Sequence, residues 1–167
     1  MLEILIKNGI YPDYEKKEMV KANIGIQDGK IAYIGQETPE AARVIEAEGK
    51  VVSPGFIDIH MHEEDFVHEG KQFIIANMML EMGVTTAVGG NCGVQKQPLS
   101  IFKSVLNELG GSPVNYLILA GYNHFRTELG IGRYAHPSQA QMDELQAIMK
   151  RELAEGAYGI SFGIEYD

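Results

Sequence analysis

Hydrophobic and polar positions alternate in short runs through the first third of the chain. The runs "LEILIKNG" and "KANIGIQDGKIAYIG" place apolar residues between turn residues, as in strands of a sheet that buries one face. Asp28 and Gly29 separate two of these runs, and a glycine there supplies the positive φ of a tight hairpin turn. The pattern predicts a small antiparallel β domain over residues 1–52, with one turn of helix at residues 39–42.

After residue 52, apolar runs of strand length alternate with segments of helical periodicity. Strands are predicted at residues 55–62, 84–90, 114–122 and 157–166, and helices at residues 71–83, 98–110 and 138–156. Strands separated by helices form right-handed βαβ units and a parallel sheet. Four such strands and three helices make the first half of a TIM-like (β/α)8 barrel, a fold that usually needs about 250 residues.

The predicted fold class is therefore α/β. The N-terminal part of a small β domain (residues 1–52) precedes the first half of a barrel (residues 53–167), which is truncated after its fourth strand. A natural domain seldom ends on a central apolar strand, and the first and fourth strands would each leave an unpaired edge. We expect the chain to pack against the remainder of its own barrel or against another copy of itself.

Charge and cysteine content narrow the class of protein. With 14 basic and 23 acidic residues the formal net charge is −9, which argues against nucleic acid as a partner. The single cysteine cannot form a disulfide within the chain. The lack of internal disulfides is typical of proteins in reducing compartments. The N-terminus lacks the basic start and cleavage site of a signal peptide, and no apolar run approaches the ~18 residues of a membrane span. We expect a cytoplasmic protein with no membrane partner.

The stretch "PGFIDIHMHEEDF" contains the first candidate site, His60 and His62. Alternation along a strand would place both imidazoles on the inward face, at the carboxyl end where barrel active sites lie. Two such imidazoles can chelate one cation, whereas the alternative is a pair satisfied by backbone carbonyls. Two histidines at a strand mouth, followed by acids, favour a metal site. Glu63, Glu64 and Asp65 then either support these histidines or form an exposed acidic turn.

The stretch "GGNCGV" supplies a second candidate at the end of the next strand, Cys92. Its flanking glycines let the backbone turn sharply there. A thiolate is a soft ligand for zinc, whereas the alternative is a buried and inert cysteine. Because Cys92 is expected at the same rim as the two histidines, the pattern favours a ligand.

The last predicted strand supplies the third candidate, Glu165. Alternation would point its carboxylate inward, and an inward carboxylate needs a cation or hydrogen-bond donors. It could contact the metal or the substrate, or pair with a lysine or arginine; the pattern leaves these alternatives open. Residues 120–126 ("AGYNHFR") are predicted to leave the third strand as a solvated loop, with His124 and Arg126 in it.

The same motifs carry a family resemblance. "VVSPGFIDIHMH" resembles the first barrel strand of the amidohydrolase superfamily, and "DGKIAYIG" its small β domain. "GVTTAVGGNCG" and "EGAYGISFGIEY" are similar to the D-aminoacylase branch, the N-acyl-D-amino-acid deacylases. The resemblance extends over nearly the whole chain, which corresponds to the N-terminal part of the proteins in this family.

The resemblance implies a function and a metal. It implies that His60, His62 and Cys92 are metal ligands, that the cofactor is zinc (one or two ions), and that zinc-activated water hydrolyses a non-peptide amide bond. The small-molecule substrate it implies is an N-acyl-D-amino acid. Departures at Tyr122, Phe162 and Glu63-Glu64, where the branch commonly has histidine, threonine and Asp-Asp, leave the acyl group and the amino acid open.

The family takes two further histidines from later strands and a catalytic aspartate from its eighth strand. No catalytic residue is therefore expected within this chain, which alone would be inactive and could lack zinc. Two alternatives remain at this point. One is another amidohydrolase, acting on a cyclic amide or a dipeptide; the other is a catalytically inert metal-binding or structural fragment.

Overall fold

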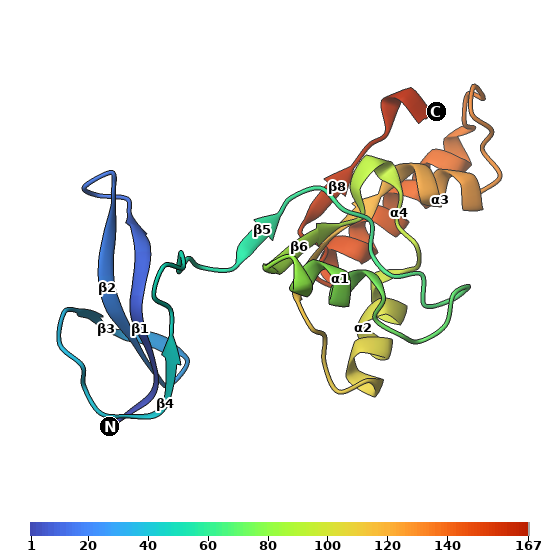
Figure 1. The fold of residues 1–167 in the computed structure, drawn as a ribbon. Coiled ribbons are helices and arrows are strands. Elements are labelled where there is room, and N and C mark those ends of the chain that lie inside the picture. The colour runs from blue at the N-terminus through green and yellow to red at the C-terminus, as the bar shows by residue number, and fades with distance from the viewer. Residues whose placement is uncertain (167) are drawn as a thin grey trace. The chain divides into compact units, whose positions relative to one another are not determined.

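A computed structural model, drawn in Figure 1, describes residues 1–166. The chain divides into two compact units, the first comprising Met1–Pro54 and the second beginning at Gly55. The change in sequence pattern had placed this boundary two residues earlier. Among the described residues, no helix has the length and apolar character that crossing a membrane requires.

The first unit is a four-stranded sheet. Asp28 and Gly29 have φ of 53° and 66°, so the hairpin predicted from this dipeptide is confirmed. The sheet is mixed rather than antiparallel, because its last strand runs parallel to the first. The strand order is β3-β2-β1-β4, with β1 (Leu2–Asp13), β2 (Glu18–Gln27), β3 (Lys30–Gly35) and β4 (Ala41–Glu46).

The helical turn predicted at residues 39–42 is wrong. Ala41 begins β4, and the backbone N–H of Leu2 donates to the carbonyl oxygen of Glu40 at 2.8 Å. The open edge of β1 offers this segment a full ladder of backbone hydrogen bonds, which outweighs a weak local helical tendency.

The second unit is a parallel sheet with helices between its strands, as predicted from the alternation of apolar runs with segments of helical periodicity. Its strand order is β5-β6-β7-β8, so β5 and β8 are the edges. The unit matches the first half of a barrel. Its strands are β5 (Phe56–Asp58), β6 (Val84–Gly89), β7 (Asn115–Gly121) and β8 (Gly159–Ser161), and its helices are α1 (Ile75–Glu81), α2 (Leu99–Glu108), α3 (Tyr122–Glu128) and α4 (Gln139–Ala154).

Helices α2 and α4 follow from local signals. Helix α4 begins with a capping box, in which Ser138 and Gln141 each accept a hydrogen bond from the other's backbone N–H. Phe102 of α2, and Leu145 and Met149 of α4, are buried at helical spacing. These side chains belong to the apolar clusters that join the helices to the sheet.

Residues 1–166 form four α-helices where three were predicted. Helix α3 occupies the segment interpreted as a solvated loop. Phe125 is buried against Ala120 and Leu145, and Arg126 is buried with its guanidinium donating to the carbonyl oxygens of Gly132 and Ala135 at 2.9 Å each. Burial of these two side chains in the tertiary structure therefore stabilises a helix that the local sequence pattern does not predict.

The edge strands are shorter than predicted and carry exposed apolar side chains. β5 and β8 have three residues each, against the eight and ten residues predicted. The exposed side chains on or beside them include Phe56, Ile57, Ile59, Tyr158, Phe162 and Ile164. Both edges thus combine unpaired backbone groups with uncovered apolar surface.

Candidate metal centre

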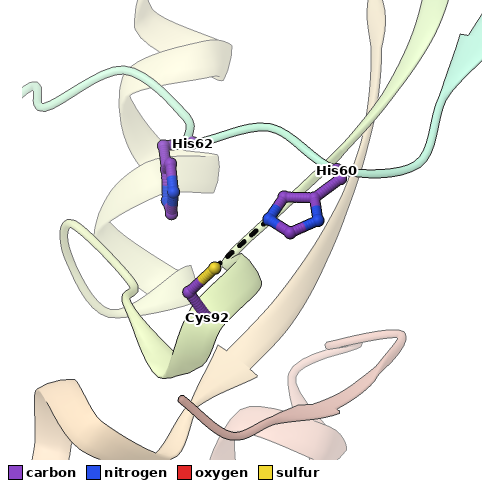
Figure 2. Close-up of side chains that lie close together, drawn as sticks. All are labelled: His60, His62 and Cys92. Atoms are coloured by element: carbon purple, nitrogen blue, oxygen red, sulfur yellow. Dashed lines mark hydrogen bonds between the residues drawn. The ribbon is translucent and has the colours of Figure 1, made fainter. Parts of the chain in front are cut away.

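The structure brings His60, His62 and Cys92 together (Figure 2). Each offers one ligand atom, and these atoms all lie within 4.8 Å of one another. The closest pair is Nε2 of His60 and Sγ of Cys92, at 3.2 Å. The two imidazole rings lie 6.3 Å apart between centroids and are nearly perpendicular, with an interplanar angle of 77°. The three residues come from two segments separated by about one βα unit.

The two histidines follow β5 rather than belonging to it. The strand ends at Asp58, whose carboxylate accepts a hydrogen bond from the backbone N–H of His60 at 2.9 Å. Met61 lies between the histidines and is buried, and its N–H donates to the carbonyl oxygen of Val88 at 3.2 Å. Met61 packs in an apolar cluster with Ala76, Met79, Ala87 and Val114. The side chains of His60 and His62, on either side of it in the sequence, are exposed. The alternation therefore outlasts the regular strand.

Cys92 lies in a tight turn after β6, the short 3-10 segment η1 (Asn91–Gly93). Its φ is 58°, in the left-handed region that residues other than glycine seldom adopt. Gly90, just before it, has φ of 74°, and a Cβ there would lie 2.0 Å from the carbonyl oxygen of Leu119. The sharp turn expected from the glycines is thus required by a close approach to β7.

Side-chain hydrogen bonds hold this turn in place. The amide of Asn91 donates to the carbonyl oxygen of Val88 at 2.6 Å and lies 3.4 Å from that of Met61, so it links the cysteine turn to the histidine segment. From β8, Ser161 accepts from the N–H of Gly93 at 3.1 Å and donates to the carbonyl oxygen of Gly90. The position of Cys92 is therefore set by three strand ends.

Neither interpretation of Glu63 and Glu64 matches the structure. Both are buried, and their carboxylates accept hydrogen bonds from backbone amides rather than from the imidazoles. Glu63 accepts from the N–H groups of Gly90 and Lys96 at 2.7 Å each. Glu64 accepts from the N–H of Ala76 at 2.8 Å, near the start of α1. The sequence offered no signal for this role beyond two adjacent acids.

Burial, hydrogen bonds and nearby charges shift two pKa values beside this segment. Burial raises the pKa of Asp65, but hydrogen bonds from the backbone and ring of His68 outweigh it, and the net pKa is below its ordinary value. Burial, followed by the carboxylates of Glu64 and Glu63, raises the pKa of Tyr116 well above its ordinary range. Asp65 is therefore the acid that pairs with a histidine, although that histidine is not one of the cluster.

A buried polar network that sequence reasoning missed lies behind the cysteine turn. Gln95 accepts from the N–H of Gly121 at 3.0 Å and donates to Glu152 at 2.9 Å. The same oxygen of Glu152 accepts from the N–H of Leu99 at 2.9 Å. Glu152 is fully buried. The loop after Cys92 is thereby tied to the end of β7, to α2 and to α4.

Glu165 is not brought into the cluster. The strand predicted to reach residue 166 ends at Ser161, and Glu165 lies with an exposed side chain in the 3-10 segment η2 (Ile164–Tyr166). Gly163 turns the chain, because its N–H donates to the side chain of Asn123 at 2.8 Å and it approaches the carbonyl oxygen of Cys92. Strand alternation therefore does not extend to Glu165, whose backbone oxygen accepts from Arg133 at 2.8 Å.

The cluster borders an open hollow of about 320 Å³. His62 and Cys92 form part of its wall, together with Val94, Lys96 and Tyr166. The hollow thus places a cationic side chain and an aromatic ring beside two of the three clustered residues.

The donor set fits a zinc ion. Two imidazole nitrogens and one thiolate sulfur are ligands that zinc prefers, with bonds of about 2.0–2.3 Å, so that ligand atoms on one ion lie about 3–4 Å apart. The 3.2 Å separation between Nε2 of His60 and Sγ of Cys92 already lies in this range. The other ligand atoms are separated by at most 4.8 Å, so a small side-chain rotation would bring them to a common ion.

Comparison with known proteins gives relatives along the whole chain. No family model matches the sequence. The D-aminoacylase of Alcaligenes xylosoxydans xylosoxydans is 26% identical over 98% of this chain. The N-acyl-D-glutamate deacylase of the same organism is 28% identical over 99%. The chain spans 38% of the length of each of these relatives.

Solved structures agree with the sequence comparison. The N-acyl-D-glutamate deacylase of Bordetella bronchiseptica, in complex with zinc and a phosphonate inhibitor, matches 99% of this chain with a TM-score of 0.79 and 28% identity. A D-aminoacylase described with a binuclear metal centre matches all of it with a TM-score of 0.82 and 27% identity. The chain covers 39% and 40% of these structures. The L-hydantoinase of Arthrobacter aurescens, at 20% identity and a TM-score of 0.57, shares the fold alone. The resemblance to the D-aminoacylase branch is therefore confirmed in sequence and in fold.

Proposed function

We propose that this chain forms the N-terminal part of a zinc-dependent hydrolase that deacylates an N-acyl-D-amino acid. One observation carries the proposal. His60, His62 and Cys92 come from two segments at the carboxyl ends of neighbouring strands, and their ligand atoms lie within 4.8 Å of one another. This convergence occurs in a chain similar along its length to deacylases of N-acyl-D-amino acids.

The three side chains would hold the metal. When bound, zinc supplies a Lewis acid for the amide carbonyl and lowers the pKa of its water toward about 7. The protein's own contribution is to fix the ligands. Met61 anchors the histidine segment in the core, and Asn91 joins that segment to the cysteine turn. Metal ligands that are held in place in this way suit catalysis rather than loose binding of a cation at the surface.

The hollow beside the cluster is the proposed place of the substrate. Its wall includes His62 and Cys92, so a small molecule bound there would lie against the metal ligands. Lys96 provides a positive charge on the same wall, which suits the carboxylate that every N-acyl amino acid carries. We assign the substrate to this class because the relatives that match the chain are named as acting on D-amino-acid derivatives.

We further propose that the site is completed by additional polypeptide, either the remainder of the barrel or another copy of the chain. The catalytic aspartate and further ligands would come from it. Support comes from the two sheet edges, where exposed side chains such as Phe56 and Tyr158 lie on or beside strands with one unpaired side. Covering apolar surface of this kind is favourable by about 25 cal/mol per Å².

The proposal is tested by metal content and turnover of the chain purified together with the polypeptide that completes its site. We expect about one or two equivalents of zinc, and release of free amino acid from N-acetyl-D-amino acids but not from the L-enantiomers. His62→Ala and Cys92→Ser should each lower zinc content and turnover at least tenfold, because each removes a ligand. His136→Ala is the matched control, since this histidine is exposed and outside the cluster.

Three outcomes would contradict the proposal in different ways. Hydrolysis of a hydantoin ring or a dipeptide in place of the N-acyl-D-amino acids would assign the chain to another amidohydrolase. Zinc binding by the completed protein without turnover on any of these compounds would indicate an inert metal-binding domain. Zinc content unchanged in both ligand variants would remove the metal site itself.

A further inference from the structure

Glu63 stands out among the buried polar residues because it joins the two segments that carry the clustered ligands. It directly follows His62, and its side chain is 1% exposed. One carboxylate oxygen accepts from the N–H of Gly90 and the other from the N–H of Lys96, each at 2.7 Å. These two amides flank the turn that contains Cys92. A single side chain from the histidine segment therefore holds both ends of the cysteine turn.

The surrounding backbone is shaped around this carboxylate. A Cβ on Gly89 would lie 2.8 Å from Oε2 of Glu63 and 3.2 Å from its Cβ, so a larger residue at 89 would displace the side chain. Gly90 adopts φ of 74°, and in this conformation its N–H donates to Oε2 of Glu63. Because both carboxylate oxygens accept from backbone amides, the group is used here entirely as an acceptor.

We propose that Glu63 is a positioning residue for the metal centre, which fixes Cys92 at ligand distance from His60 and His62. The inference rests on the proposed function, since it assumes that these three residues bind a metal. Glu63 touches neither the ligand atoms nor the hollow beside them. Its effect on metal binding is transmitted through the backbone of the cysteine turn, from residue 90 to residue 96.

The geometry predicts which replacement uncouples the turn. In Glu63→Gln the amide oxygen can accept from one of the two N–H groups, but its NH2 would face the other as donor against donor. One end of the turn then loses its anchor while the side-chain volume is kept. Glu64→Gln is the matched control. It changes the adjacent, equally buried carboxylate, whose one backbone partner, Ala76, lies outside the turn and can still be satisfied by an amide oxygen.

The experiment measures cobalt(II) and zinc binding to the protein purified with the polypeptide that completes its site, and to the two variants in the same form, with a thermal melt of each. Cobalt bound to a thiolate gives a sulfur-to-metal charge-transfer band, which reports on Cys92 specifically, and Cys92→Ser sets the baseline without it. We expect Glu63→Gln to raise the Kd for cobalt about 10–100-fold and to weaken this band. Glu64→Gln should leave both within about twofold, even if it lowers the melting temperature as much.

The outcomes separate this inference from the proposed function. If the unmodified protein binds neither metal, the proposed metal site fails. If it binds both, and Glu63→Gln keeps the affinity and the band, the positioning role is overturned while the metal site stands. Equal losses in Glu63→Gln and Glu64→Gln would also overturn it, because they would reflect general destabilisation. Should Glu63→Gln not fold, Gly89→Ala replaces it. Its Cβ would lie 2.8 Å from Oε2 of Glu63 and displace the carboxylate, so the same loss is expected and an unchanged affinity would refute the inference.

Discussion

The carboxyl end of the second unit's sheet and its two edges are organised in opposite ways. At the carboxyl end, Glu63, Gln95 and Glu152 are buried and accept hydrogen bonds from backbone amides of the segments that they join. At the edges, apolar side chains such as Ile57 and Ile164 are exposed beside unpaired strands. The site region is thus fixed by contacts within the chain, whereas the edges have the character of surfaces that other polypeptide covers. Each of the following changes tests one side of this contrast.

The largest effect is expected from Glu152→Ala. This side chain is fully buried, and its removal leaves the N–H of Leu99 and one hydrogen of the Gln95 amide without their acceptor. Each unsatisfied buried donor costs about 1–3 kcal/mol, so we expect a loss of about 2–5 kcal/mol in the free energy of unfolding. Urea denaturation measures it. Glu144→Ala, at an exposed position of the same helix, should change this free energy by less than about 0.5 kcal/mol; similar losses in both would mean that the network stabilises nothing.

A smaller effect is expected from Gly90→Ala, compared with Gly49→Ala. The two glycines have nearly the same φ, 74° and 72°, but a Cβ would meet the Leu119 carbonyl at position 90 and open space at position 49. Gly49→Ala should cost about 1–2 kcal/mol for the left-handed backbone alone. Gly90→Ala should cost more and should also displace Cys92, which thiol accessibility to an alkylating reagent would report. An equal cost at both positions would show that the approach of β7 does not constrain the turn.

The smallest effect on stability is expected at the edge, from Ile57→Thr. Ile57 is 63% exposed, so its replacement should change the free energy of unfolding by no more than about 0.5 kcal/mol. If another copy of the chain covers this edge, the same change should shift the mass measured by light scattering toward the monomer. A large loss of stability in a chain that is monomeric throughout would place this side chain in the chain's own core and remove the contrast.

The sequence predicted the order of elements well, because hydrophobic period and glycine stops are local. Helix α4 begins at its capping box, and α2 ends before Gly110, which has φ of 77°. The failures are tertiary. Helix α3 forms because Phe125 and Arg126 find buried partners in other segments, and β4 pairs in parallel because the edge of β1 is open. Neither cause is visible within a short window of sequence.

At the candidate site, the same distinction separates His62 from Glu165. Both were placed by strand alternation, and both lie beyond the end of their strands. Alternation persists at His60 and His62 because buried Met61 holds the backbone between them. Alternation ends before Glu165, because the N–H of Gly163 donates to the side chain of Asn123 and the chain turns there. The predicted convergence of the histidines with Cys92 therefore depends on the burial of one apolar residue, Met61. The acceptor role of Glu63 had no comparable signal.

The left-handed backbone at Cys92 also limits how this position can change during evolution. Asparagine, aspartate and histidine adopt φ near 58° more readily than other residues with a side chain, whereas valine, isoleucine and threonine are the most strained there. Among possible metal ligands, an aspartate or a histidine could thus replace the thiol with little change to the turn. A single substitution would then exchange a soft ligand for a harder one and alter which metals the site favours. The shape of this turn leaves ligand chemistry open to selection while it excludes most apolar replacements.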